Sequence, residues 1–142
     1  MGRIRQAFRI ALGALFAASG LLKIADPSAF AFAIARLQVA PRGWIGAVAI
    51  VLPWIEAVAG AALLFAPGYR EAAARLILGL LVALTAVLLV AMVRGTAGPC
   101  GCFGGGEGLL SRPWAALARN VVLAGMAAVL TCRPRSAPAS PA

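Results

Sequence analysis

Four long apolar stretches dominate the chain, and charged residues, glycine or proline separate them from one another. A bilayer core about 30 Å thick is crossed by roughly 20 helical residues, and each stretch reaches that length once its flanks are included. The pattern therefore predicts transmembrane helices over residues 7–24, 44–66, 72–93 and 113–131. The third is the clearest, because Leu76–Val93 contains no charged residue.

A shorter helix is predicted between the first two. Asp26 followed by Pro27 is a typical helix start, with a capping carboxylate and then proline at the first helical position. Apolar residues recur at helical spacing as far as Leu37, and Pro41 ends the segment. We expect an interfacial helix that covers one end of the bundle.

Taken together, these elements predict an all-α fold, an integral membrane four-helix bundle with a short interfacial helix between the first and second transmembrane helices. Residues 1–132 form one domain in this interpretation, and residues 94–112 connect the last two helices. The tail, residues 133–142, is rich in proline and small residues and is expected to be disordered.

The composition agrees with a membrane protein, since 63% of the residues are hydrophobic and only 12% are charged. The net charge of +9 comes from basic residues that flank apolar runs, so we interpret them as lipid-headgroup contacts and predict no nucleic-acid partner. The chain has no histidine, which excludes Ser-His-Asp and Cys-His catalysis and histidine-ligated zinc or haem within one subunit.

The distribution of basic residues predicts the orientation in a cytoplasmic (inner) membrane. Seven of them lie on the side of the two termini and five on the other side, which favours cytoplasmic termini by the positive-inside rule. The connection 94–112 then faces the extracytoplasmic space, where disulfides persist. The basic N-terminus also resembles a signal peptide, but the apolar run continues past the candidate cleavage site, so we expect it to remain as the first helix.

Cys100-Gly101-Cys102 lies at the centre of this glycine-rich connection. Two cysteines one residue apart can close a disulfide only through a very small ring, whose strain makes it easy to reduce and suited to exchange. Two alternatives stay open: the cysteines are incidental small residues, or they supply half of a metal site that another subunit completes. Cys132 follows the fourth helix, about 27 Å away along its axis, and cannot join this pair.

Glu56 lies near the middle of the second predicted transmembrane helix, where a bare carboxylate costs roughly 2.5–3.5 kcal/mol. Arg119 in the fourth helix is the favoured partner, with Lys23 and Asp26 as shallower competitors. The pair has two interpretations: a buried ion pair that fixes the helix register, or a site for proton transfer or a quinone headgroup. Small residues at four-residue spacing, such as Gly13 and Ala17, would let helices approach closely.

Four segments resemble one family: SGLLKIADP closing the first helix, PWIEAVAG in the second, the CGCFG connection and LARNVVLAG in the fourth. The sequence resembles the methylamine utilisation protein MauE family, within the wider DoxX-like group of four-helix membrane proteins. The resemblance extends from the first helix to about Leu130, and CGCFG is its most specific part. It implies redox roles for Cys100 and Cys102, and matching polar positions at Glu56, Lys23, Arg119 and Asn120.

The resemblance implies a membrane redox-accessory protein that exchanges disulfide and dithiol equivalents with a periplasmic thioredoxin-like partner. In the name-giving members, the enzyme matured is methylamine dehydrogenase. Such a protein would be a thiol-disulfide oxidoreductase or an electron-transfer accessory. It has one cysteine pair where quinone-coupled disulfide oxidases have two, so a quinone either acts directly on this pair or is not used. A noncatalytic membrane anchor or assembly subunit, and behind it a small proton-coupled transporter, are the alternative functions.

Overall fold

The structure is a computed structural model that describes residues 2–96 and 113–132. Four long helices, α1 (Gly2–Ala25), α3 (Arg42–Phe65), α4 (Arg70–Val93) and α5 (Pro113–Thr131), make up most of it. The shorter α2 (Pro27–Leu37) lies between α1 and α3, and a 3₁₀ turn, η1 (Pro67–Tyr69), joins α3 to α4. These described ranges contain no strand, so the predicted all-α fold is confirmed.

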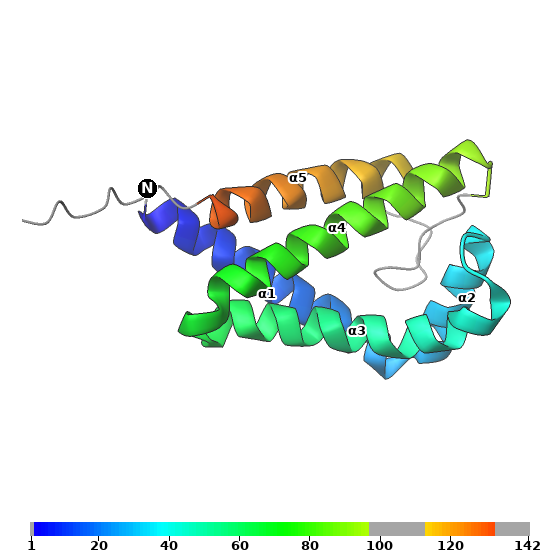
Figure 1. The fold of residues 1–142 in the computed structure, drawn as a ribbon, viewed down its shortest axis with the longest axis horizontal. Helices are drawn as coiled ribbons and strands as arrows, with labels where there is room; N and C mark the ends of the chain where they lie inside the picture. Colours follow the sequence, from blue (N-terminus) through cyan, green and yellow to red (C-terminus); the bar gives the residue numbers. More distant parts are fainter. Residues whose placement is uncertain (1, 97–112, 133–142) are drawn as a thin grey trace, which may run out of the picture.

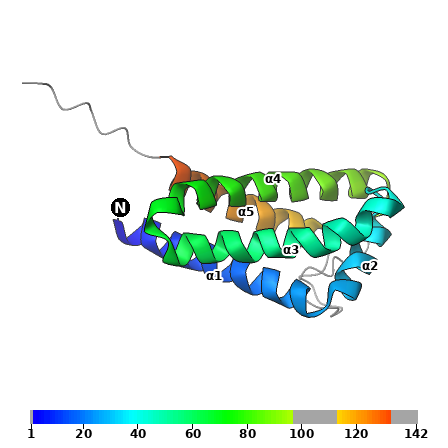
Figure 2. The same ribbon diagram turned by 60° about the horizontal axis from the view of Figure 1, so that its bottom comes forward.

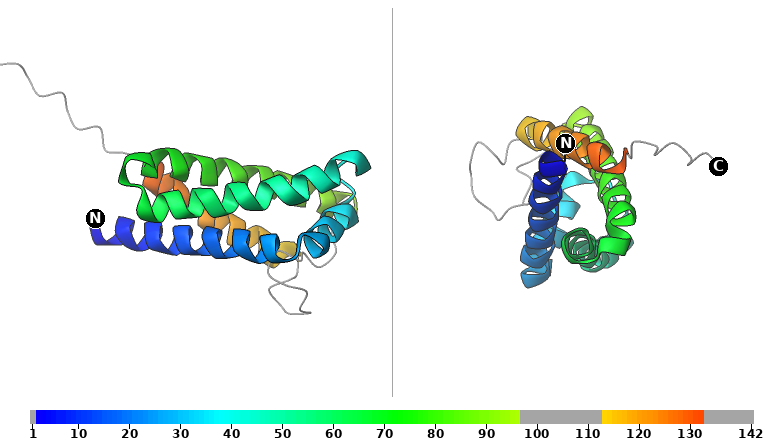
Figure 3. Two further views of the ribbon diagram at one scale, coloured as in Figure 1. Left: turned by 90° about the horizontal axis from the view of Figure 1, so that it is seen from below. Right: turned by 90° about the vertical axis from the view of Figure 1, so that its left-hand side faces the viewer.

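The long helices run up and down, so that consecutive ones are antiparallel (Figure 1). α1 packs most extensively on α3, and α4 on α5, while contacts between α3 and α4 and between α1 and α5 close the ring. The start of α1, η1 and the end of α5 therefore lie at one end of the bundle, which we call the terminal end. α2 lies at the opposite end, which Figure 2 and the left view of Figure 3 show clearly.

Four helices are long and apolar enough to cross a membrane, and they correspond to the four predicted spans. Many large apolar side chains on their outer faces are exposed, among them Val58 at 62%, Val82 at 59% and Val122 at 62%. A soluble protein rarely exposes a continuous apolar surface of this kind, whereas lipid chains cover it without cost. The chain is therefore a multi-pass membrane protein in contact with the lipid bilayer.

The closest helix contact joins α1 to α3 through small residues. A β-carbon added at Gly60 would lie 2.5 Å from the amide nitrogen of Ala17 and 2.7 Å from the carbonyl oxygen of Gly13. The two backbones can approach this closely only because Gly60 has no side chain. The predicted role of Gly13 and Ala17 as packing residues is thus confirmed, and the partner surface on α3 includes Gly60.

α2 begins as the sequence predicts. Asp26 Oδ1 accepts a hydrogen bond from the backbone amide of Ala29 at 3.0 Å and another from Ser28 Oγ at 2.7 Å, and Pro27 occupies the first turn. The helix ends at Leu37, where Gln38 takes a left-handed conformation with φ 52° and donates its amide to the carbonyl of Ala35. Helix α2 packs on α3 and lies at the end of the bundle, in the position expected for the interfacial helix.

The helices differ from the predicted ranges mainly at their starts. α1 begins at Gly2 rather than near residue 7, because hydropathy marks the apolar part of a helix and Arg3 and Arg5 extend the same helix beyond it. The connection 94–112 is described only to Thr96, so the prediction for Cys100 and Cys102 lies outside the described residues. The prediction for the tail, residues 133–142, lies outside them as well.

Candidate functional site

A buried polar cluster joins α1 to α3 inside the bundle. Lys23 Nζ lies 2.5 Å from Glu56 Oε2, and the two side chains are 7% and 3% exposed. Lys23 Nζ also donates to Ser19 Oγ at 2.9 Å, and the Ser19 hydroxyl is 3.4 Å from the same carboxylate oxygen. Ser19 and Lys23 lie one helical turn apart, so α1 presents both on the face that meets Glu56.

The surroundings of Lys23 explain why a charged pair is stable there. Its ammonium group lies 5.2 Å from the centroid of the Phe30 ring, which α2 places over it, so a cation–π contact adds to the ion pair. On the α3 side, Pro53 is buried one turn before Glu56. Each charge thus has a partner of opposite sign, and the cost of bringing either one alone into the membrane is avoided.

The cluster forms the polar wall of a cavity of about 360 Å³. Most of the cavity lining is apolar and comes from all five helices, with Phe16 from α1, Ile34 from α2, Leu52 from α3 and Leu84 from α4. The polar and charged residues of the lining are Ser19, Lys23, Arg36, Glu56, Arg119 and Asn120. An apolar cavity with a few convergent polar groups is the usual form of a small-molecule site in a protein.

The structure brings Glu56 and Arg119 to the same cavity, as two elements of one candidate site. The ion partner of Glu56 is nevertheless Lys23 and not Arg119, so the predicted partner was wrong. Arg119 is favoured in the sequence by its depth along the fourth transmembrane helix. Depth ignores the direction in which a side chain points. Because the glycine contacts hold α1 against α3, the face of α1 that carries Lys23 is turned directly toward Glu56.

Sequence reasoning did not single out Ser19. The signal was present, because Ser19 precedes Lys23 by four residues and such pairs share a helix face. Asn120 was noted only through the family resemblance, and in the structure it is 7% exposed, one residue after Arg119 on α5. Buried polar residues in a membrane helix are expensive unless they have partners, and Arg119 and Asn120 mark the side of α5 that lines the cavity.

The start of the cysteine-containing connection is attached to α2. Thr96 Oγ1 donates to the carbonyl oxygen of Leu37 at 3.0 Å, and an Arg94 guanidinium nitrogen lies 3.4 Å from the carbonyl oxygen of Gln38. Leu37 also lines the cavity. The last described residues before Cys100 therefore lie at the same end of the bundle as α2.

The sequence over residues 1–133 matches the family described as Methylamine utilisation protein MauE. It is also similar to "Methylamine utilization protein MauE" of Paracoccus denitrificans, at 36% identity over 138 residues, which cover 94% of this chain and 72% of the relative. The chain belongs to the MauE family. No solved structure matches it.

Membership of the MauE family supports a role in methylamine utilisation. Independently of the family, the cavity with its buried ion pair is the candidate site on the described part of this MauE chain. In residues 2–96 and 113–132, no group of three or more histidine, cysteine or acidic residues is placed to hold a metal ion. Cys132 is exposed and follows α5 at the terminal end, away from α2 and from the start of the cysteine connection.

Proposed function

We propose that this protein is a membrane redox accessory of methylamine utilisation, which exchanges disulfide and dithiol equivalents through Cys100 and Cys102. The observation that carries the proposal is a Cys-Gly-Cys motif in the connection between two membrane helices of a MauE family member. Its partner is a periplasmic thioredoxin-like protein, and the enzyme that benefits is a periplasmic one that needs disulfides. The termini are cytoplasmic and the connection extracytoplasmic in this proposal, as the positive-inside rule favours.

The exchange needs only the cysteine pair of this protein and the cysteine pair of its partner, one as a disulfide and the other as a dithiol. A thiolate of the partner attacks one sulfur of the Cys100–Cys102 disulfide, a mixed disulfide forms, and the other cysteine leaves as a thiolate. The partner's second thiolate then attacks the mixed disulfide, so the partner becomes a disulfide and Cys100 and Cys102 become two thiols. Two electrons have moved. The same steps in reverse reduce the partner, and the two reduction potentials decide the direction.

Differential thiol alkylation in intact membranes tests this proposal. A Cys132→Ser background leaves Cys100 and Cys102 as the only thiols of the chain. At graded glutathione ratios we expect a reversible two-electron transition, and Cys100→Ser or Cys102→Ser alone should accumulate a mixed disulfide with the partner. Thiols that stay in one state at every ratio would contradict the redox role.

The alternative is a noncatalytic anchor or assembly subunit, in which the connection only docks another protein. It predicts that the double variant Cys100→Ser, Cys102→Ser still binds its partner and still supports maturation of the client enzyme. A proton-coupled transporter is a weaker alternative that rests on Glu56. It predicts loss of function in Glu56→Gln and none in the cysteine variants.

The cavity favours a quinone as the electron acceptor or donor of this system. Its volume and its mostly apolar lining fit a ring with an apolar tail, and the Lys23 ammonium and the Asn120 amide are donors suited to carbonyl oxygens. When bound, a quinone would supply two-electron chemistry next to the membrane. Glu56 would hold Lys23 in place, and the apolar residues would exclude water.

Binding of a short-chain quinone analogue to the purified protein, measured by equilibrium dialysis, tests this second proposal. Leu84→Trp fills the cavity from α4, and Leu89→Trp places the same bulk at a position that is 45% exposed on the same helix. We expect affinity to fall at least tenfold in Leu84→Trp and to stay unchanged in Leu89→Trp. Equal affinity in the two variants would place the analogue elsewhere.

A further inference from the structure

A second cavity, of about 630 Å³, lies at the terminal end of the bundle, opposite the candidate site. The beginnings of α1 and α4, the turn η1 and the end of α5 surround it. Its charged lining consists of Arg5, Arg9, Arg70 and Glu71, and Leu63 and Leu130 supply part of its apolar lining. The cavity is thus distinct from the site described above in both position and chemistry.

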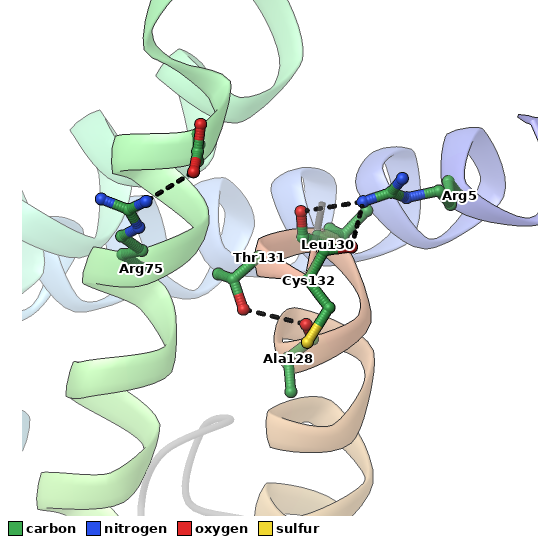
Figure 4. A network of polar contacts seen from close by, with 7 residues as sticks. Arg5, Arg75, Ala128, Leu130, Thr131 and Cys132 are labelled. Atoms are coloured by element: carbon green, nitrogen blue, oxygen red, sulfur yellow. Dashed lines mark hydrogen bonds and ion pairs between the residues drawn. The ribbon is translucent and has the colours of Figure 1, made fainter. Parts of the chain in front are cut away.

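The charge in this cavity is strongly positive. Among the residues that the structure describes, Glu71 is the one acidic residue of the lining, and Glu71 Oε1 accepts a hydrogen bond from Arg75 at 2.5 Å, from one turn along α4. Figure 4 shows Arg75 with its ion pair on α4, and this side chain is 67% exposed and is not part of the cavity lining. The lining therefore carries three guanidinium groups and one carboxylate, and the Glu71 carboxylate is also paired with Arg75. An anion is the ligand that complements this excess of positive charge.

Two of the arginines have buried donors. The Nε atoms of Arg9 and Arg70 are buried, and neither has a hydrogen-bond partner among the residues that the structure describes. A buried N–H group without a partner is costly, so each side chain gains by turning its guanidinium group toward an acceptor. After such a rotation, the Nε–H and a neighbouring NηH form the two-pronged donor that fits phosphate oxygens. Arg5 is engaged differently, since it donates to the carbonyls that end α5.

The position of the cavity relative to the membrane selects the source of the phosphate. A 24-residue helix such as α1 is roughly 36 Å long, which exceeds the roughly 30 Å hydrocarbon core, and the basic residues Arg3 and Arg5 favour the headgroup layer for its first turns. Phe65 at the end of α3 is 80% exposed and Tyr69 at the end of η1 is 71% exposed, close in sequence to the lining residues Pro67 and Gly68, and exposed aromatic side chains at helix ends are typical of the membrane interface. Lipid chains contact such residues, whereas free phosphate gains nothing from them.

We propose that this cavity binds the phosphate group of an anionic phospholipid, with Arg9 and Arg70 as the donors. The ligand's acyl chains would run along the apolar surface beside Phe65. A lipid at this site would add to the direct contact that Arg5 of α1 makes with the end of α5 and would extend it to the start of α4.

The test uses the full-length protein in nanodiscs or micelles, titrated with phosphatidylglycerol or phosphatidylcholine and followed by native mass spectrometry and thermal unfolding. We expect phosphatidylglycerol to bind at least tenfold more tightly than phosphatidylcholine. Arg9→Gln with Arg70→Gln should remove most of that difference. The matched control is Arg3→Gln, because Arg3 is exposed on the same helix end and does not line the cavity.

A charge-conserving variant separates a built site from diffuse attraction. Arg9→Lys with Arg70→Lys keeps the charge but removes both Nε–H donors, so we expect roughly tenfold weaker binding, against no change in Arg3→Lys. If the double variant does not fold, Arg70→Lys alone gives the same comparison. Equal losses in the Arg3 variants, or equal affinity for the two lipids, would overturn the proposal. If millimolar inorganic phosphate displaces the lipid, the site binds phosphate but its ligand is not a phospholipid, and the proposal of a lipid is overturned.

Discussion

Gly20 of α1 lies directly against Ala57 of α3: a β-carbon at Gly20 would be 2.6 Å from the Ala57 amide nitrogen. Backbone atoms on the facing helix cannot move aside as a flexible side chain can. We therefore expect Gly20→Ala to lower the free energy of unfolding by about 2–3 kcal/mol, at the upper end of the overpacking range. Thermal unfolding of the purified protein measures this loss.

Gly79 and Gly125 provide matched controls, because a β-carbon at either would meet nothing within 4 Å. Alanine there should be neutral or stabilising by up to about 1 kcal/mol, since glycine is a poor helix residue. A Gly79→Ala variant as unstable as Gly20→Ala would mean that the α1–α3 contact is not the cause.

The ion pair of Lys23 and Glu56 predicts non-additive substitutions. Lys23→Met leaves a buried carboxylate without its partner, and breaking a buried pair in this way costs about 3–5 kcal/mol. Lys23→Met combined with Glu56→Gln removes both charges, so the double variant should be more stable than Lys23→Met alone. Unfolding in a double-mutant cycle should give a coupling of at least about 1 kcal/mol. Additive losses would show that the two side chains act independently.

Arg5 caps the C-terminal end of α5. One of its guanidinium nitrogens donates to the carbonyl oxygens of Val129 at 3.2 Å, Leu130 at 3.3 Å and Cys132 at 3.0 Å. Figure 4 shows Arg5 reaching the end of α5 at Leu130 and Cys132. The last carbonyls of a helix have no partner within it, and a cation there also suits the helix dipole. Arg5→Gln should therefore loosen the last turn of α5, at a cost of about 1 kcal/mol for these partly exposed bonds.

Hydrogen exchange measures this effect locally. In Arg5→Gln the amides of residues 129–132 should exchange faster, while those in the middle of α4 should not change. Arg3 is exposed and lies two residues before Arg5. Arg3→Gln removes the same charge and should leave the last turn of α5 protected. Equal effects in both variants would assign the stabilisation to general charge.

Asp26 predicts a pH dependence for α2. The hydrogen bond from the Ala29 amide, followed by the one from the Ser28 hydroxyl, lowers the pKa of Asp26 below its usual range. A lowered pKa in the folded state means that the cap stabilises α2 above the ordinary pKa and loses that effect as pH falls through the folded value. Amide exchange in the first turn of α2, corrected for the intrinsic rate, should increase at acid pH.

Asp26→Asn supplies the comparison for this pH effect. Asparagine caps helices about as well as aspartate but does not titrate in this range. The variant should keep α2 protected at neutral pH and lose the acid-induced increase in exchange. An unchanged pH profile would assign the titration to another group.

The membrane helices and α2 could be predicted because each depends on local chemistry. Apolar length decides whether a helix can span a bilayer, and the carboxylate of Asp26 before Pro27 decides where α2 begins. The partner of Glu56 could not be predicted in the same way, because it depends on how α1 is rotated against α3. Gly20 and Gly60 determine that rotation through contacts between residues far apart in the sequence.

The cavity at the terminal end shows the same limit. Arg5, Arg9 and Arg70 look in the sequence like ordinary basic flanks, and only the closure of the helix ring brings them together. The resemblance to the MauE family pointed correctly to the family. It did not reveal Ser19 or the cap that Arg5 gives to α5.

The hydrogen bond from Thr96 to the Leu37 carbonyl joins the segment before Cys100 to a helix that lines the inner cavity. Where breaking this bond and displacing α2 are parts of one two-state change, linkage makes the two regions reciprocal. A protein that binds the connection more tightly in the displaced state, and a molecule that fills the cavity and holds α2 in place, would then weaken each other's binding by the same factor. Binding of a small molecule in the inner cavity and binding of a partner protein to the connection would then report on the same conformational equilibrium.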